Sequence, residues 1–350
     1  VAAFQVSPDD WPTYRADNAR TTETQAVVPD TVGLLWQSKP KVRFEPSAPV
    51  VAGGVAFVSG SDGIVRAFDA ATGAAKWTAY TGGAVRYPPA IAGGRALVGS
   101  GDGWAYAFEA ATGRLLWRFR AAPVERKIPV YGSLLSTWPV ASGVLVDSGV
   151  AYFAAGINNY DGTHVYALDA TTGKIKWQNN TSGFPVGGSR SGVGVQGDLL
   201  LHNGKLYLAG GNAVSPGVYD AKDGKCHTPL ARGVASRSRR GRELRLVNGG
   251  VTVSGQPLYS RPGVPVFSRE VRWTAADVMT KNAKLSLERT PGGKRVVWKL
   301  VAQSRTTKQR LWAQPLPAPP VRWGMAVDAQ GRIVVTLWSG EVLCFGKKAG

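Results

Sequence analysis

One eleven-residue pattern recurs in this chain and limits what the chain can fold into. The tryptophans that end its first two copies, Trp77 and Trp117, stand 40 residues apart. A fixed period of that length is typical of proteins built from repeated units that pack on one another. The three copies are AFDAATGAAKW at 67–77, AFEAATGRLLW at 107–117 and ALDATTGKIKW at 167–177.

Each unit of the repeat contains short stretches in which apolar and polar residues alternate. Glycines and acidic residues separate these stretches, as at Gly53-Gly54 and at the AATG sequence that ends in Gly73. Alternation with a period of two, interrupted by turn residues, predicts antiparallel strands. Four such strands in about 40 residues are typical of one blade of a β-propeller. In the first unit we expect strands over 47–51, 55–59, 64–68 and 74–78.

Local turn chemistry explains why the AATG sequence recurs. Asp69 can accept hydrogen bonds from the amides of its own turn, and Gly73 can take the positive φ that the turn needs. The tryptophan that follows presents a large ring at a constant place in each unit, where packing on the neighbouring sheet buries on the order of 200 Å². We therefore interpret these tryptophans as packing between blades rather than as platforms for a ligand.

The sequence predicts an all-β fold, a single β-propeller of four-stranded antiparallel blades. We expect seven blades, although the faint repeat signature of residues 230–310 also admits eight. The last unit, 320–346, shows only three strands, and a strand at 31–37 can supply the fourth and remove the exposed sheet edges. We therefore divide the chain into a leader segment, 1–30, that packs on the propeller, and a propeller over 31–350 with irregular blades at about 230–310.

The net charge of the chain is +19, from 42 basic and 23 acidic residues. A field of that sign favours anionic partners: acidic polysaccharide, anionic lipid or nucleic acid. The densest basic run, 231–244, lacks interleaved aromatic residues and a nucleic-acid fold signature, so we expect no nucleic acid partner. A solvated basic surface without any ligand is the alternative explanation of the same charge.

Two features bear on location. No apolar run approaches the ~20 residues that span a bilayer, so we expect no transmembrane segment. The sequence begins at Val1, which fits the removal of a signal peptide and predicts a secreted or periplasmic protein.

The three copies share the pattern A-[FL]-[DE]-A-x-T-G-x-x-x-W, which resembles the repeat of the pyrroloquinoline quinone (PQQ) enzyme-like superfamily of β-propellers. The stretch DWPTYRADNARTT at 10–22 also resembles the leader of secreted BamB-like members of that superfamily. The resemblance covers about 10–180 and 320–346. It implies the propeller fold, and it implies either a BamB-like binding or scaffold role or the activity of a quinoprotein dehydrogenase.

Similarity to the quinoprotein dehydrogenases implies a pair of vicinal cysteines together with acidic and amide ligands for Ca²⁺. The two cysteines of this chain, Cys226 and Cys344, are far apart in the sequence and depart from that pattern. In a PQQ-dependent dehydrogenase the cofactor carries the redox chemistry. We therefore expect neither PQQ nor calcium, and the three histidines are too few for another metal cluster.

The links between the predicted blades are long and varied, whereas the AATG corners are short and uniform. Such links emerge around one mouth of a propeller's central channel, where functional groups concentrate. Arginines recur in these links, and a guanidinium group binds carboxylate or sulfate through two hydrogen bonds. We expect a basic mouth for an acidic polysaccharide or an envelope protein partner; alternatively, these arginines brace the loops. The predicted ligand-binding residues are Arg43, Arg86, Arg126, Lys127, Arg190, Arg322 and Trp323.

The leading prediction is thus a binding or scaffold module, and the alternative is a polysaccharide lyase acting on uronate-containing glycans. Such a lyase needs a cation beside the uronate carboxylate and a base near the α-proton. The linking arginines offer the cation. The candidates for the base are His164, Tyr87, Tyr131 and Tyr160.

Overall fold

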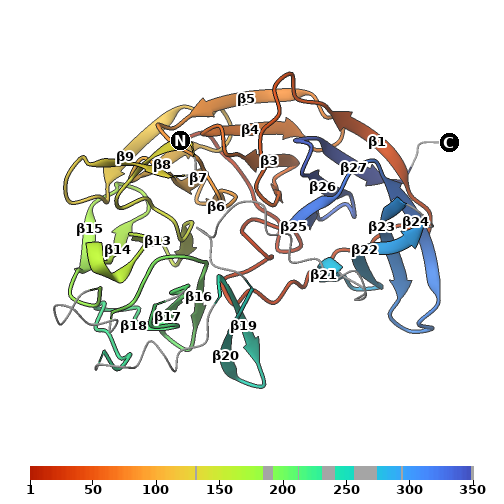
Figure 1. Ribbon diagram of the computed structural model, residues 1–350. Helices are drawn as coiled ribbons and strands as arrows, with labels where there is room; N and C mark the ends of the chain where they lie inside the picture. Colours follow the sequence, from red (N-terminus) through yellow and green to blue (C-terminus); the bar gives the residue numbers. More distant parts are fainter. Residues whose placement is uncertain are drawn as a thin grey trace.

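The computed structural model describes residues 1–130, 132–183, 192–211, 213–230, 241–255, 274–292 and 295–347. Within these ranges the regular structure consists of β-strands and a 3₁₀ turn at Asn159–Asp161. The sheets are antiparallel and follow one another around a common centre in chain order (Figure 1). No helix in this part of the chain has the length and apolarity needed to cross a membrane.

The first three repeat units form the most regular sheets. The first comprises β2 (Val50–Ala52), β3 (Val55–Ser59), β4 (Ile64–Asp69) and β5 (Ala75–Tyr80), and the second β6 (Ala90–Ala92), β7 (Arg95–Gly99), β8 (Trp104–Glu109) and β9 (Leu115–Arg120). The third comprises β12 (Leu145–Asp147), β13 (Val150–Ala155), β14 (His164–Asp169) and β15 (Ile175–Asn179). An extra hairpin, β10 (Lys127–Val130) and β11 (Ser133–Ser136), accounts for the longer third interval. The prediction of four-stranded antiparallel blades is confirmed for these units.

The middle of the chain departs from this regular pattern. A three-stranded sheet contains β16 (Leu199–His202), β17 (Lys205–Leu208) and β18 (Gly217–Asp220), and a two-stranded one contains β19 (Glu243–Val247) and β20 (Gly250–Ser254). Four strands return in β21 (Thr274–Met279), β22 (Ala283–Gly292), β23 (Arg295–Ser304) and β24 (Arg310–Leu316).

The final sheet joins the two ends of the chain. It contains β25 (Pro320–Val327), β26 (Ile333–Leu337), β27 (Val342–Gly346) and β1 (Gly33–Ser38). Strand β1 pairs antiparallel with β27, from Gly33 opposite Gly346 to Ser38 opposite Val342. Figure 1 shows the two strands side by side. The strand predicted at 31–37 therefore supplies the fourth strand of the last unit.

The repeated tryptophans join one sheet to the next. In each case the indole Nε1–H donates to an alanine carbonyl that follows the third strand of the neighbouring sheet. Because Trp36 lies on β1, its bond joins the final sheet to the first. The bonds are Trp36 to Ala70 (3.0 Å), Trp77 to Ala110 (2.9 Å), Trp117 to Ala170 (3.1 Å) and Trp177 to Ala221 (2.9 Å). The interpretation of these tryptophans as packing between blades is confirmed.

The corner sequence is both a turn and a socket for the neighbouring indole. Gly113 has a φ of +76°, and a Cβ at this position would lie 2.7 Å from the ring of Trp77. A side chain is therefore excluded twice, by the backbone conformation and by the ring. In the equivalent turn of the first sheet, Asp69 accepts hydrogen bonds from the amides of Thr72 (2.9 Å) and Ala71 (3.0 Å), which hold the pKa of Asp69 below its ordinary value.

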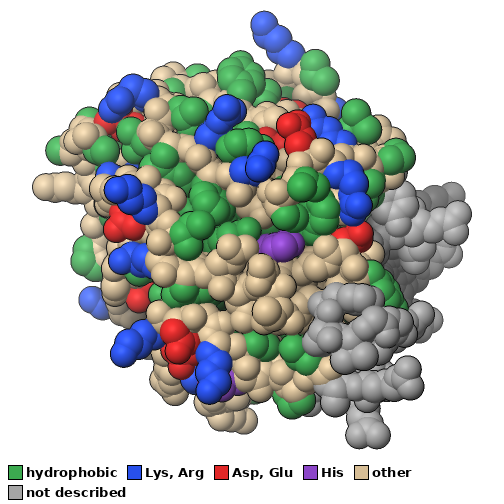
Figure 2. All heavy atoms as spheres, turned by 90° about the vertical axis from the view of Figure 1, so that its left-hand side faces the viewer, with side chains coloured by type: hydrophobic (Ala, Val, Ile, Leu, Met, Phe, Trp, Pro, Cys, Tyr) green, Lys and Arg blue, Asp and Glu red, His purple; other side chains and the backbone are tan. Residues whose placement is uncertain are grey.

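The outermost strand of a sheet leaves one edge of backbone hydrogen-bonding groups without a partner strand. Strands β5, β9, β15 and β24 occupy this position. Each carries an exposed basic side chain: Lys76, Arg118, Lys176 and Arg310, respectively. Charges on an edge strand oppose edge-to-edge association. Figure 2 shows Lys and Arg side chains scattered over one side of the molecule, with Asp and Glu among them. Part of the net charge of +19 therefore lies on the outer edges of the sheets.

Replacement of Trp77 by alanine is expected to lower the free energy of unfolding by about 3–5 kcal/mol, because a buried ring is removed together with its bond to Ala110. Trp77→Phe keeps a ring and is expected to lose less. Denaturant titration measures both. Tyr80→Ala, on the same strand at a site 70% exposed, is the control and is expected to change stability by no more than about 0.5 kcal/mol. Equal losses for Trp77→Ala and Tyr80→Ala would contradict the role of this seam.

Candidate functional site

The first strands of the sheets lie toward the centre of the molecule, around a central region that the leader crosses and that we call the channel (Figure 1). Because the strands alternate in direction, the links between sheets reach one end of this channel, which we call the mouth. The turns between the first and second strands lie at the opposite end, the far end. A side chain placed in a link or at the start of a first strand is therefore near the mouth.

Residues 10–28 of the leader pass among these first strands. The contacts reach β2, β6, β12, β16, β19 and β21, so the leader bonds to the inner strands of six sheets. Hydrogen bonds join Trp11 to Val51, Pro12 to Ile91, Asn18 to Val146 and Leu201, Arg15 to Leu244, and Thr24 to Met279. The leader thus ties together strands that do not pair with one another.

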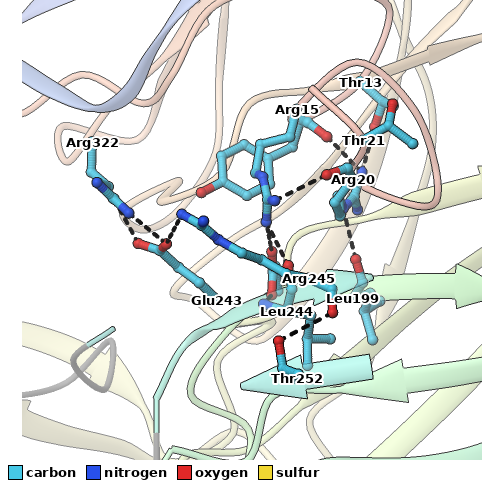
Figure 3. A network of polar contacts seen from close by, with 12 residues as sticks. Thr13, Arg15, Arg20, Thr21, Leu199, Glu243, Leu244, Arg245, Thr252 and Arg322 are labelled. Atoms are coloured by element: carbon cyan, nitrogen blue, oxygen red, sulfur yellow. Dashed lines mark hydrogen bonds and ion pairs between the residues drawn. The ribbon is translucent and has the colours of Figure 1, made fainter. Parts of the chain in front are cut away.

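Two buried arginines anchor the leader (Figure 3). Arg20 donates from Nε to the carbonyl of Leu199 (2.8 Å) and from Nη1 to that of Tyr14 (2.7 Å). Arg15 donates from Nη1 to the carbonyl of Leu244 (2.6 Å) and from Nη2 to that of Arg20 (2.9 Å). A buried cation is stabilised when its donors have partners, and here backbone oxygens of β16, β19 and the leader itself accept from both guanidinium groups, although the Nε of Arg15 has no partner among the described residues.

Two buried acids complete the charged network. Asp198 accepts from the amide of Leu244 (2.9 Å) and lies 3.6 Å from Nη1 of Arg15. Burial raises the pKa of Asp198 to about 6, against the opposing effect of Arg15. Glu243 accepts two hydrogen bonds from Arg322, at 2.9 and 3.0 Å (Figure 3). Although burial acts to raise it, these bonds hold the pKa of Glu243 below its ordinary value.

Trp323, predicted to bind a ligand, lies inside this network. Its side chain is buried, and the guanidinium carbons of Arg15, Arg322 and Arg245 lie 4.4, 4.8 and 5.0 Å from its ring centroid. Its backbone has a φ of +57°, which is uncommon for a residue with a side chain. The structure therefore places Trp323 as a cation–π partner of the arginines beneath the mouth.

A pocket of about 100 Å³ opens at the mouth, beside this network. Its lining brings together three of the predicted residues: Arg86 and Tyr87 from the link before β6, and Arg322 from β25. It also includes Tyr14, from the leader, and Arg242, which precedes β19. Links, the leader and the start of β25 thus converge on one cavity.

The arginines of this pocket differ in how they are neutralised. Arg86 pairs with Glu45 (3.2 Å), and Arg322 pairs with Glu243. Within the part of the chain that the structure describes, the side chain of Arg242 makes no ion pair or hydrogen bond. Arg242 is therefore the cation of the pocket that is left to meet an external anion.

Tyr14 and Tyr87 face each other in this lining. Their ring centroids are 5.1 Å apart and the rings meet at 81°, an edge-to-face contact. Neither hydroxyl makes a hydrogen bond to a described residue, and neither oxygen is fully buried. Burial raises the pKa of Tyr14 and of Tyr87, so both phenols keep their protons at neutral pH and act as donors.

A second group of predicted residues gathers around Trp138, beside the hairpin β10–β11. The guanidinium of Arg126 lies 4.6 Å from the Trp138 ring centroid and donates to Asp161 (3.1 Å). His164, at the start of β14, packs edge-on against the same ring at 6.3 Å, and burial lowers its pKa. None of these residues belongs to the lining of the mouth pocket.

The remaining predicted residues lie apart from the pocket lining or outside the described ranges. Lys127 is exposed at the start of β10, Tyr160 is 51% exposed in the 3₁₀ turn, and Arg43 is exposed in the link before β2. Arg190 and Tyr131 lie outside the described residues.

The sequence analysis missed four residues of the site: Tyr14, Asp198, Arg242 and Glu243. Tyr14 stands inside the leader motif, and Arg242 and Glu243 stand in the basic run 231–244, so their sequence contexts were visible. The ion pair between Glu243 and Arg322 could not be predicted, because the two residues are 79 positions apart in the sequence. No local period relates such residues.

Comparisons with known proteins show what this arrangement resembles. The family model described as "Outer membrane protein assembly factor BamB" matches residues 20–259. The solved quinohemoprotein alcohol dehydrogenase from Comamonas testosteroni has a TM-score of 0.56 and 15% identity, over 97% of this chain and 81% of that one. The quinohemoprotein alcohol dehydrogenase ADHIIG from Pseudomonas putida HK5 has a TM-score of 0.51 and 16% identity, over 96% and 72%. Likeness at these identities concerns the fold.

Two further comparisons add little to this result. The solved BamB from Moraxella catarrhalis has a TM-score of 0.40 and 14% identity, over 91% of this chain and 100% of that one. No curated protein matches the sequence.

The described residues do not fit a quinone held by calcium. Within them, no group of three or more His, Cys, Asp and Glu side chains is arranged to hold a metal ion. Cys226 follows β18 and Cys344 lies in β27, so the two thiols cannot form a vicinal pair. The carboxylate in the pocket lining is that of Glu45, which Arg86 already pairs. The pocket therefore lacks the ligand set that such a cofactor needs.

Arg20→Ala is expected to lower the free energy of unfolding by about 3 kcal/mol, because the carbonyls of Leu199 and Tyr14 lose a charged donor in a buried site. It is also expected to speed proteolysis of residues 1–30. Denaturant titration and limited proteolysis measure the two effects. The exposed Arg43→Ala is the control and is expected to change neither. Proteolysis of the leader at the wild-type rate in Arg20→Ala would contradict the anchoring role.

Asp198 predicts a pH dependence of stability. Its pKa is raised from 3.8 to about 6 in the folded protein, so the folded state holds a proton that the unfolded state has lost, and stability falls as pH rises from about 4 to about 6. A pKa difference of about two between the folded and unfolded states corresponds to about 3 kcal/mol of unfolding free energy. Asp198→Asn lacks this titration, so the difference in unfolding free energy between the two proteins is expected to change by about that amount across the window. A constant difference from pH 4 to 7 would contradict the shift.

Proposed function

The chain belongs to the family of outer membrane protein assembly factor BamB, and from this premise we propose that it is a binding module that docks an acidic segment of a partner protein in the mouth pocket. In this proposal the ring has seven blades, with β1 as the outer strand of the last. The sheets formed by the described residues, the hairpin β10–β11 aside, support that number. The family description also supports a place in the cell envelope, in the periplasm or after secretion.

The observation that carries the proposal is the convergence of Arg86, Arg242 and Arg322 on one pocket. Guanidinium groups bind carboxylates through paired, charge-assisted hydrogen bonds. Since Glu45 and Glu243 already neutralise two of the three, the pocket has one cation in excess at Arg242. One excess cation in a small cavity suits a single acidic side chain.

The same charge count favours a protein segment over an acidic polysaccharide. A polyuronate repeats its charge along its length and needs cations spaced along a groove. Arg126 is not in the pocket lining; it lies against Trp138 and is paired with Asp161. An extended peptide that inserts one carboxylate needs no such groove.

A lyase has less support from the geometry than a binding module. A general base works best when its pKa is near the working pH. Burial raises the pKa of Tyr87 well above that range, and His164 is outside the pocket lining. The pocket therefore offers donors to an anion but no base close to it.

The test compares a synthetic peptide rich in aspartate and glutamate with its asparagine and glutamine counterpart, by calorimetry at physiological ionic strength. The acidic peptide is expected to bind and the amide peptide to bind at least ten-fold more weakly. Arg242→Gln is expected to lower the affinity for the acidic peptide about ten-fold or more, because it removes the cation that has no ion-pair partner among the described residues. Arg43→Gln, an exposed arginine outside the pocket lining, is the matched control and is expected to bind as the wild type does.

Equal binding of both peptides would overturn the proposal. Alginate and heparin are the glycan arm of the same experiment. If they bind, if Arg242→Gln abolishes their binding and if neither peptide binds, the ligand is a glycan and the protein partner is wrong. Release of unsaturated uronates from alginate, followed by ultraviolet absorbance, would show a lyase instead.

A further inference from the structure

We propose that the hydroxyls of Tyr14 and Tyr87 and the guanidinium of Arg242 form one site that binds a carboxylate group in the mouth pocket. The three side chains line the same cavity, of about 100 Å³. The inference refines the docking function proposed above by naming the chemical group that enters and the atoms that receive it.

The first support is that no acceptor among the described residues uses these donors. Tyr87 is only 8% exposed and Tyr14 is partly buried, and neither hydroxyl bonds to a described residue. Neither oxygen is fully enclosed, so both face the solvent of the pocket. An external acceptor that displaces water from these hydroxyls keeps both hydrogen bonds and adds a charge-assisted one from Arg242.

The second support is that the donors are held in place before any ligand arrives. Tyr14 belongs to the leader and Tyr87 to the link before β6, and their edge-to-face contact at 5.1 Å fixes each ring against the other. The guanidinium of Arg20 lies 5.6 Å from the centroid of the Tyr14 ring, and Arg20 also donates a hydrogen bond to the Tyr14 carbonyl. Donors fixed in advance lose little entropy on binding.

The third support is the balance of charge, which selects the class of ligand. Two neutral phenol donors and one cation match a monoanion that has two acceptor oxygens, which is a carboxylate. A phosphate dianion needs a second uncommitted cation, but Arg86 is paired with Glu45. Because burial keeps both phenols protonated at neutral pH, they donate to the anion and do not repel it.

The probe for this site is acetate, compared with chloride and sulfate at constant ionic strength. In the wild type, acetate is expected to raise the thermal midpoint more than either other anion, through binding to the folded state. Tyr14→Phe and Tyr87→Phe remove one hydroxyl each and leave the ring packing in place. Each is expected to weaken acetate binding about ten-fold, as a hydrogen bond to a charged group is lost. Arg242→Gln is expected to weaken it at least as much.

Two matched variants control for non-specific effects. Tyr80→Phe removes the hydroxyl of a tyrosine that is 70% exposed and outside the pocket lining, and Arg310→Gln removes an exposed cation of β24. Both are expected to keep the acetate response of the wild type. The thermal midpoint of every variant in chloride alone reports any loss of folding stability and is subtracted.

The outcomes separate this inference from the docking proposal. If Arg242→Gln abolishes binding of the acidic peptide while both tyrosine variants bind peptide and acetate as the wild type does, the tyrosine site is wrong and docking stands. If acetate binds and the tyrosine variants weaken it, but no acidic peptide binds, the carboxylate site stands and docking is wrong. A sulfate response equal to that of acetate would overturn the assignment to carboxylate.

Discussion

The hydrogen bond from an indole to an alanine carbonyl of the next sheet is the interaction on which the rest of the structure depends. Sheets that only touch can slide past one another, whereas a directed bond at a fixed point sets their spacing and angle. The seam is specific because Gly113 and its equivalents leave room for the ring while completing the turn. Once successive sheets keep a constant relation, their links all reach the same end of the channel, where a site can form.

The centre of the molecule presents a second physical problem, because the inner strands of successive sheets do not pair with one another there. This chain fills the space with its leader, whose polar backbone needs partners as it crosses. Carbonyls of the inner strands accept hydrogen bonds from Arg15 and Arg20. Asp198 and Glu243 offset part of the positive charge of the arginines in this region. The same leader contributes Tyr14 to the mouth pocket, so the element that fills the channel also shapes the cavity above it.

The parts of this fold that could be predicted are those with a local cause. The corner at Asp69 follows from short-range turn chemistry, and the strand at 31–37 follows from counting the strands of the last unit. The arginines Arg86 and Arg322 could be placed at the mouth because the repeat sets a register from which links can be counted. These inferences need only periodicity and the direction of strands.

The rest could not be predicted because it depends on side-chain pairing over long distances in sequence. That Arg126 would lie against Trp138 rather than face the channel depends on the course of an inserted hairpin. That Arg322 would be neutralised by Glu243, and Arg242 left without a partner, depends on which of several charges meet in space. Composition revealed an excess of basic residues but not which of them already had partners.

Between the sheet β16–β18 and the hairpin β19–β20, no indole bond joins the described residues, and Thr228 stands where the pattern has tryptophan. Here the amide of Asp198 donates to the carbonyl of Arg242, and the carboxylate of Asp198 accepts from the amide of Leu244. From the leader, Arg20 donates to β16 and Arg15 donates to β19. Four seams carry neutral hydrogen bonds between adjacent sheets, whereas this junction is held through buried charge and through the leader. Because Arg242 adjoins this junction, a ligand bound at Arg242 would contact the place where the leader replaces the indole bond.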